Sequence, residues 1–276
     1  MSQRAKAELF RQLHQGPRAL LLPNIWDVVS ARLVEQAGFP AIATSSAAVA
    51  WVLGWPDGER ISRDEMATVV ARIASSVAVP VTADMEAGYG PRPEDVAATA
   101  KAVIAAGAVG MNLEDAVSPT ELIDQTMQVE RIRAACDAAQ SAGVPIVVNA
   151  RTDVFLKQIG EPETRIAHTV RRLNAYREAG AASLFAPGVR DPDTIGVLAR
   201  EVGGPLNILA GAGAPSIAEL ERLGVRRVSL GASVMRAALG AVRRVAEELR
   251  GAGTFTALAD LALTDDLNRL LSESRG

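Results

Sequence analysis

Three acidic side chains follow two apolar runs near the middle of the chain. Asp84 and Glu86 come after one run, and Glu114 ends the next. Alternation along an extended chain places Asp84 and Glu86 on one side, and Asn112 with Glu114 likewise. Three carboxylates that converge repel one another unless a cation lies between them. Because no His or Cys lies in these segments, the donors are all oxygen, which predicts Mg²⁺, with Mn²⁺ as an alternative. Asp115 either joins this set or only caps a helix.

Two further segments suit an anionic substrate. Arg151 follows another apolar run, and with three carboxylates and one divalent cation it gives a formal charge of zero. The small-residue loop at Ser45, Ser46 and Ala47 can bring backbone N–H groups close to a carboxylate. A 2-oxo acid that chelates Mg²⁺ has a polarised carbonyl, which makes an enolate accessible. This chemistry covers aldol-type cleavage, decarboxylation and P–C rearrangement, and it leaves the substrate open.

Eight short apolar runs alternate with longer helical segments, and these elements must position the acids. The predicted strands cover residues 19–23, 41–45, 79–84, 110–114, 146–150, 183–186, 206–210 and 227–230. Runs that are apolar on both faces, each followed by a crossover helix, are typical of parallel strands. We therefore expect an α/β fold with one (β/α)8 TIM barrel, spanning residues 1–276, whose functional side chains stand at the carboxyl ends of the strands.

The C-terminal part has more helix than a barrel needs. Helices are predicted over residues 234–249 and 258–271, the second with an apolar stripe of leucines. We expect residues 234–276 to make oligomer contacts, the alternative being a helix folded under its own barrel.

Composition narrows the class of protein. The 276 residues are 49% hydrophobic and 4% aromatic, with a formal charge of −3 and no basic tail. This composition excludes general disorder and argues against nucleic-acid binding. The chain shows no membrane-spanning run and no signal peptide, so we expect a cytoplasmic protein without membrane partners. The single cysteine, Cys136, is expected to be a packing thiol rather than a nucleophile.

At these residues the sequence resembles the isocitrate lyase/phosphoenolpyruvate mutase superfamily over residues 20–233. The motifs that carry the resemblance occur in family order at residues 23–27, 44–46, 56–57, 84–90, 113–115 and 149–153, and at Asn207. The resemblance implies that Asp84 binds Mg²⁺ directly and that Glu86 and Glu114 act on it directly or through water. It also implies a homotetramer, built as a dimer of dimers that exchange their C-terminal helices.

Roles for the other site residues come from the same resemblance. It implies that Ser45, Ser46 and Ala47 hold the substrate carboxylate together with Arg151. It implies that Arg151, Glu114 and Asp57 are catalytic residues, with Asp57 near the reacting carbonyl. It also implies that Asn207 lies in the pocket wall.

The sequence departs from the better-known branches in three places. Residues 116–124 lack both the Lys-(Lys/Arg)-Cys-Gly-His loop of the lyases and the gating loop of the mutases. Residues 184–188 lack the lyase glutamate, and Glu86 replaces the second Asp of Asp-x-Asp. Efficient cleavage of isocitrate or methylisocitrate is therefore not expected, since a general acid is missing. The chain resembles the short members without that cysteine, of the oxaloacetate decarboxylase or hydrolase type or the carboxyphosphonoenolpyruvate mutase type.

Three functions remain open at this level. The first is a Mg²⁺-dependent lyase, decarboxylase or hydrolase that acts on a small 2-oxo acid or an oxaloacetate-like 2-oxo dicarboxylate through an enolate. The second is P–C chemistry on phosphonopyruvate-like compounds. Glycine-containing segments at 210–213 and 231–233 would bind phosphate in that case, or else only tighten turns. The third is a barrel that binds 2-oxo acids without turnover.

Overall fold

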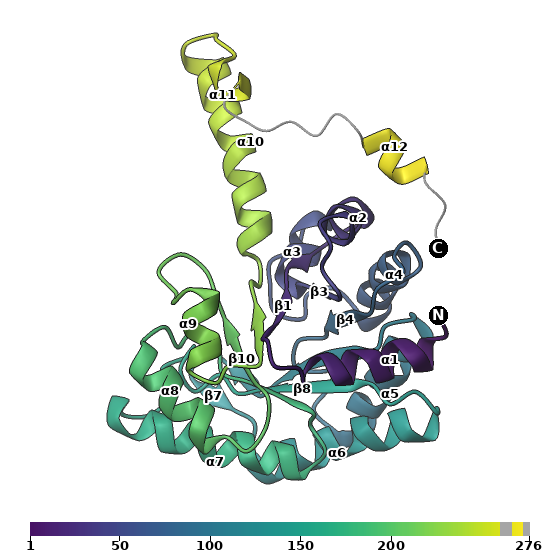
Figure 1. Ribbon diagram of the computed structural model, residues 1–276, viewed down its shortest axis with the longest axis vertical. Coiled ribbons are helices and arrows are strands. Elements are labelled where there is room, and N and C mark those ends of the chain that lie inside the picture. Colours follow the sequence, from purple (N-terminus) through teal and green to yellow (C-terminus); the bar gives the residue numbers. More distant parts are fainter. Residues whose placement is uncertain (260–266, 273–276) are drawn as a thin grey trace.

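The computed structural model describes residues 1–259 and 267–272, and a parallel nine-stranded sheet lies at its centre (Figure 1). The strand order is β1-β11-β10-β9-β8-β5-β4-β3-β2. Its strands are β1 Leu20–Leu22, β2 Asn24–Ile25, β3 Ile42–Thr44, β4 Val81–Asp84, β5 Gly110–Glu114, β8 Val147–Arg151, β9 Ser183–Phe185, β10 Leu206–Leu209 and β11 Arg227–Ser229. All eight predicted strand positions are confirmed.

The first predicted strand is in fact two, because Pro23 interrupts it. Proline has no N–H to donate to a sheet. β1 pairs with β11 and β2 pairs with β3, so the first and last strands meet and the sheet curls into a barrel. The side chain of Asn24 joins the two sides: Oδ1 accepts the N–H groups of Leu230 and Gly231, each at 2.8 Å, and Nδ2 donates to the carbonyl of Thr44 at 2.7 Å.

Helices cover the outside of the sheet, as repeated β/α units require (Figure 1). Along the described residues, no helix is long and apolar enough to cross a lipid bilayer. The helices are α1 Gln3–Leu13, α2 Val28–Gln36, α3 Ser46–Val52, α4 Arg63–Ala74, α5 Pro93–Ala105, α6 Gln125–Ser141, α7 Arg165–Glu178, α8 Pro192–Glu201, α9 Ile217–Arg222, α10 Ser233–Gly251, α11 Thr256–Ala259 and α12 Leu267–Ser272, with a 3-10 turn at Pro162–Thr164.

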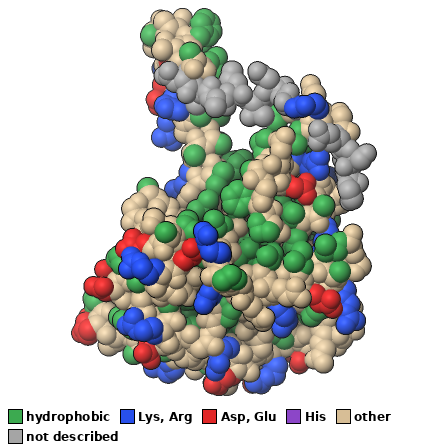
Figure 2. Space-filling view, viewed as in Figure 1, with side chains coloured by type: hydrophobic (Ala, Val, Ile, Leu, Met, Phe, Trp, Pro, Cys, Tyr) green, Lys and Arg blue, Asp and Glu red, His purple; other side chains and the backbone are tan. Residues whose placement is uncertain are grey.

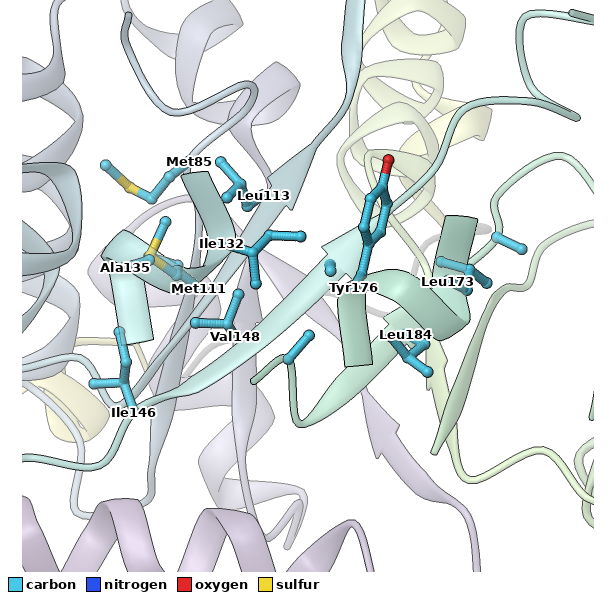
Figure 3. Close-up of a cluster of buried hydrophobic side chains, with 14 of the residues drawn as sticks. Met85, Met111, Leu113, Ile132, Ala135, Ile146, Val148, Leu173, Tyr176 and Leu184 are labelled. Carbon is cyan, nitrogen blue, oxygen red and sulfur yellow. The ribbon is translucent and has the colours of Figure 1, made fainter. Parts of the chain in front are cut away.

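The largest hydrophobic cluster lies between the strands and the outer helices (Figure 3). Met111 and Leu113 of β5 point outward and pack in this cluster with Ile132 of α6 and Tyr176 of α7. Alternation then turns Asn112 and Glu114 of the same strand toward the barrel interior, as predicted. The outward face of β5 thus contributes to the core while its inward face carries the polar groups.

The amino end of the barrel is closed by α1. Phe10 and His14 stack edge to face at 4.7 Å, and His14 Nδ1 lies 2.7 Å from the Phe10 carbonyl oxygen. Arg227 of β11 is fully buried and reaches His14 Nε2 at 3.4 Å. Burial, and next the charge of Arg227, lower the pKa of His14 to about 3, so the ring is neutral and accepts from the arginine.

The C-terminal helices differ in where they lie. α10 points away from the barrel (Figure 1), and among its residues only Met235 is buried. This arrangement confirms the predicted helix over 234–249 and does not support folding of that helix under its own barrel. Of the second predicted helix, α11 and α12 are seen, whereas residues 260–266 lie outside the described part of the chain. α12 packs against α2, where Arg32 donates to the Leu270 carbonyl at 3.2 Å.

Candidate active site

Asp84 ends β4 at the carboxyl mouth of the barrel, and neighbouring strands hold its carboxylate in place. Oδ2 accepts hydrogen bonds from the backbone N–H and the hydroxyl of Ser46, at 3.1 and 2.9 Å. Oδ1 accepts from Asn112 Nδ2 at 3.2 Å, and the Asp84 N–H donates to Thr44 Oγ1 at 2.9 Å. The carboxylate therefore has a fixed orientation before any ligand arrives.

Glu86 reaches the same mouth through a turn and not by strand alternation. Its φ of +50° bends the chain just after β4, so the expected extended geometry is wrong at this residue. The side chain is 3% exposed; Oε2 accepts the Glu59 N–H, while Oε1 has no hydrogen-bond partner among the described residues. Burial, and next the charge of Asp84, raise the pKa of Glu86 to about 8.

Two glycines of the same turn make this bend possible. A Cβ at Gly88 would lie 2.9 Å from Leu113 Cδ1, and one at Gly90 would lie 2.5 Å from Asp95 Cβ. Arg131 of α6 supports the turn from below, donating to the carbonyls of Ala87 and Gly90. Glycine is therefore required at both positions, because the turn packs too closely against β5 and α5 to admit a side chain.

Glu114 and Arg151 stand side by side at the ends of β5 and β8. Arg151 Nη1 lies 2.5 Å from Glu114 Oε2, and the same guanidinium binds both carboxylate oxygens of Asp153, at 2.6 and 2.9 Å. Burial opposes ionisation of Glu114 and raises its pKa, whereas Arg151 lowers it. Three of the five N–H groups of Arg151 thus face acids, which leaves two for another acceptor.

Asp115 belongs to a separate network behind this pair. Its Oδ1 accepts the Asp153 N–H at 2.9 Å, and its Oδ2 accepts from Arg172 Nε at 2.8 Å and from the Tyr176 hydroxyl at 2.7 Å. Asp115 is fully buried and Arg172 is 5% exposed. Asp115 is therefore a structural acid that supports Asp153, and through it Arg151.

A cavity of about 380 Å³ opens at this mouth, between the loops that follow four strands. Its walls include the loop after α3, the Glu86 turn and the short antiparallel hairpin β6 Ala116–Ser118 and β7 Glu121–Leu122. This hairpin occupies the 116–124 region and was not predicted. Lys157, from the loop after β8, completes the wall.

Backbone strain is concentrated around this cavity. Among the described residues, the non-glycine residues with positive φ are Glu59, Glu86, Tyr89 and Gln158. Glu59 donates its N–H to Glu86 and accepts the Tyr89 N–H at 2.8 Å, and Gln158 follows Lys157. Such outliers cluster at functional sites, where the surroundings enforce them.

The acids fit a hydrated divalent cation. Within the described residues, no three His, Cys, Asp or Glu side chains are close enough to coordinate one ion together. The orphaned Oε1 of Glu86 is nevertheless buried beside the fixed Asp84, and both offer only oxygen donors. An ion that keeps several of its own waters, as Mg²⁺ does, suits acids held apart in this way.

Of the remaining predicted site residues, some lie at the cavity or contact Asp84, and others are buried away from it. Asp57 lines the cavity, and Ser46 holds Asp84. Ser45 is a buried helix cap whose hydroxyl accepts the Ala48 N–H at 3.4 Å, and the adjacent Ala47 is half-buried. Asn207 is buried inside the barrel next to Ser229, at 3.3 Å, and the structure does not bring it to the cavity wall.

The glycine segments after β10 and β11 use their backbone groups internally. Leu230 and Gly231 donate to Asn24, and Ala214 donates to the Gly211 carbonyl at 3.0 Å. These contacts favour a turn-tightening role over phosphate binding. The thiol of Cys136 lies in α6, far from the mouth, and burial raises its pKa to about 11. A raised pKa keeps the thiol protonated, as expected for a packing thiol rather than a nucleophile.

Comparison with known proteins identifies the family. The family model described as phosphoenolpyruvate phosphomutase matches residues 10–250. The chain belongs to this family. It is therefore an enzyme of the isocitrate lyase/phosphoenolpyruvate mutase superfamily, and its barrel is the superfamily's TIM barrel.

One relative with a similar sequence and two with similar solved structures illustrate this membership. The chain is 32% identical to an oxaloacetate decarboxylase of Pseudomonas aeruginosa strain UCBPP-PA14, over 88% of this chain and 85% of that one. It superposes on a candidate lyase or mutase from Burkholderia cenocepacia J2315 with a TM-score of 0.91 and 42% identity, covering 98% and 96% of the two chains. A 2,3-dimethylmalate lyase gives a TM-score of 0.82 and 30% identity, with 96% and 94% covered.

Sequence reasoning missed two residues of the site. Glu59 and Lys157 both lie in loops, several residues beyond a strand end, and neither belongs to a motif that carries the family resemblance. The useful signal was the position of Lys157 in the loop that follows Arg151 and contains Asp153.

Proposed function

We propose that this protein is a Mg²⁺-dependent lyase, decarboxylase or hydrolase that acts on a small 2-oxo acid, with oxaloacetate-like dicarboxylates as the preferred class. The observation that carries the proposal is the pair formed by Asp84, whose carboxylate is fixed by three donors, and Glu86, whose Oε1 is buried without a partner. Asp84 and Glu86 would hold a divalent cation there, which would polarise the substrate carbonyl and so make the adjacent enolate accessible. Mn²⁺ has the same ligand preferences and is the alternative ion.

The chain's own residues orient the substrate and exclude water. Ser46 and Asn112 keep the Asp84 carboxylate aimed at the mouth. Arg151 offers its two remaining N–H groups to the carboxylate next to the reacting carbonyl. Asp57 faces that carbonyl from the opposite loop, where desolvation and the charge of Asp84 raise its pKa. The β6–β7 hairpin lines the site without supplying a thiol, which is why isocitrate cleavage is not part of the proposal.

Proton NMR of substrate consumption tests the function. Purified protein with Mg²⁺ is mixed separately with oxaloacetate, 2-methylisocitrate, dimethylmalate, phosphonopyruvate and 2-oxoglutarate, beside an Asp84→Ala control. We expect consumption of a 2-oxo dicarboxylate or substituted malate that the control loses and that a chelator abolishes. Consumption of phosphonopyruvate alone would replace the proposal with P–C chemistry. Binding without consumption would contradict any catalytic reading.

We also propose that the protein assembles as a homotetramer, a dimer of helix-swapped dimers. Leu239, Val242 and Leu249 form an exposed apolar stripe on α10, with 45, 64 and 45% of each side chain exposed. A groove of about 490 Å³ beside β1 is lined by apolar residues of α1, β1 and the 39–40 turn, and Figure 2 shows hydrophobic side chains gathered over this surface. The α10 of a second copy is the occupant that suits the groove.

Light scattering tests the assembly. The wild type should have the mass of four chains, and Val242→Asp should lower it because a charge in an apolar interface is costly. A monomeric wild type would contradict the assembly without bearing on the catalytic proposal.

A further inference from the structure

The wall of the active-site cavity carries two cationic side chains, and they differ in setting. The cavity is lined by the acids Asp57, Glu59, Glu86 and Glu114 and by the cations Arg60 and Lys157. Arg60 is exposed and also borders a separate surface hollow over residues 61–65. Lys157 is half-buried and lines the active-site cavity. Of the two, Lys157 is therefore the cation placed to meet a ligand inside.

Lys157 makes no contact ion pair with an acid within the described residues. Its ammonium makes no ion pair there, although four acids line the same cavity. Arg151, one strand end away, is in contrast bound to both Glu114 and Asp153. An ammonium is a strongly hydrated point charge, so holding one half-buried and unpaired leaves a favourable place for an incoming anion.

The backbone that carries Lys157 is held firmly. The Lys157 N–H donates to the Asp153 carbonyl at 2.8 Å, and the Ile159 N–H donates to the Val154 carbonyl at 2.9 Å. Gly188 lets this turn pack closely, because a Cβ there would lie 2.8 Å from the backbone N and Cα of Leu156. The turn is thus anchored to Asp153, which also binds Arg151, so the two cations have a common support.

Asp57 shows how the charges are arranged across the cavity. Desolvation and then Asp84 raise the pKa of Asp57, whereas Arg151 and Lys157 lower it. The charges of Asp84 and Lys157 therefore both act on Asp57. Because Lys157 lines the same cavity as Asp57, Glu86 and Glu114, a ligand whose 2-oxo end lies at the two glutamates shares that cavity with the Lys157 ammonium.

We propose that Lys157 binds the distal carboxylate of a 2-oxo dicarboxylate and so selects dicarboxylates over 2-oxo monocarboxylates. The inference rests on the proposed function, which supplies the inner end of the ligand. It adds the residue that recognises the outer end, which neither the family motifs nor the strand ends indicate.

Calorimetric titration in the presence of Mg²⁺ tests this role with two four-carbon probes. These are 3,3-difluorooxaloacetate, which carries a distal carboxylate, and 2-oxobutyrate, which does not. The variants are Lys157→Met, which keeps the aliphatic stem, Lys157→Arg, which restores a cation, and Arg60→Met, which removes the other cation of the cavity wall. Circular dichroism confirms that each variant is folded.

We expect a loss of binding affinity for the dicarboxylate probe alone, and only when Lys157 loses its charge. Lys157→Met should weaken binding of the difluoro dicarboxylate about 10- to 100-fold and leave 2-oxobutyrate within about 3-fold. Lys157→Arg should recover most of the dicarboxylate affinity, and Arg60→Met should change neither ligand by more than about 3-fold.

Other outcomes overturn the inference in distinguishable ways. Equal weakening of both probes by Lys157→Met would show a merely structural role. A wild type that binds both probes equally would remove the selectivity and leave the proposed function standing. A wild type that binds neither probe would remove the proposed function as well.

Discussion

Glu114 and Asp115 are consecutive acids with opposite surroundings. Glu114 turns into the cavity, where it shares Arg151 with Asp153 and lies near the charges of Asp84 and Glu86. Asp115 turns away into the space between β5 and α7, where two carboxylate oxygens receive three donors. The cavity around Glu114 gathers several carboxylates with few hydrogen-bond donors. In the network around Asp115, both carboxylate oxygens accept hydrogen bonds.

This contrast separates functional acids from structural ones. A buried acid that is fully bonded contributes to folding, and removing it leaves its partners unpaired. A buried acid with an orphaned oxygen, such as Glu86, costs stability in the empty protein, and only a ligand can offset that cost. The contrast predicts opposite effects on activity and stability in the two regions.

The largest effect is expected at Asp84. Asp84→Ala should lower turnover by about 10³-fold or more, because the positioned carboxylate is lost, while the free energy of unfolding without metal should fall by about 1 to 3 kcal/mol, because Ser46 and Asn112 lose their acceptor. Substrate consumption by NMR and urea denaturation of the same preparation measure the two quantities. If Asp84→Ala lost its folded structure as well as its activity, Asp84 would be a structural acid too, and the contrast with Asp115 would fail.

The opposite pattern is expected at Asp115. Asp115→Ala should cost about 3 to 5 kcal/mol of stability, since Arg172 is left buried without its counterion. Urea denaturation of the variant beside Asp115→Asn, which keeps an acceptor for the Asp153 N–H, gives the measurement. Stability equal to wild type would mean that the network contributes nothing to the fold.

A third effect concerns the amino end, where a neutral His14 accepts from Arg227. Its pKa of about 3 in the folded protein lies below 6.5, the value in the unfolded chain. As the pH falls below 6.5 the unfolded chain binds a proton that the folded protein does not, so this contribution to stability is lost progressively toward pH 3. Between pH 7.5 and 5.0 the loss should be about 2 kcal/mol.

Denaturation at those two pH values isolates the histidine. His14→Gln keeps an acceptor near Arg227 and cannot titrate, so its stability should change about 2 kcal/mol less than that of wild type over the same interval. Identical changes in both proteins would show that His14 is already protonated in the folded state.

A fourth effect, of opposite sign with pH, is expected at Glu86. Its folded pKa of about 8 lies above the unfolded value, so stability falls as the pH rises from 4.5 to 8. Glu86→Gln keeps an acceptor for the Glu59 N–H and removes the charge, so without metal at pH 8 it should be more stable than the wild type, and the difference should shrink toward pH 4.5. Chelated protein and variant are compared by urea denaturation, and a less stable variant would contradict the argument.

The sequence was sufficient for the barrel because its signals are local. Each strand is a short apolar run, and the position of Asp84 at the end of such a run indicates the mouth. Asp115 could not be assigned from the sequence, because its partners Arg172 and Tyr176 lie 57 and 61 residues further along the chain.

Other parts of the site depended on backbone geometry that composition does not reveal. The positive φ of Glu86 replaces strand alternation with a turn. Lys157 comes to the cavity because Gly188, on a different loop, allows close packing of the backbone. Asn207, read from a motif, is directed into the barrel by its place within β10.

The contact made by Asn24 sets the order in which the protein can be completed during synthesis. Its acceptor oxygen waits for the N–H groups of Leu230 and Gly231, which the ribosome adds more than 200 residues later. At about 5 to 20 residues per second, the 206 residues from Asn24 to Leu230 take roughly 10 to 41 s to make. Until β11 is made, β1 has no partner strand on that side, and β1 is the edge through which a nascent chain could pair with a neighbour.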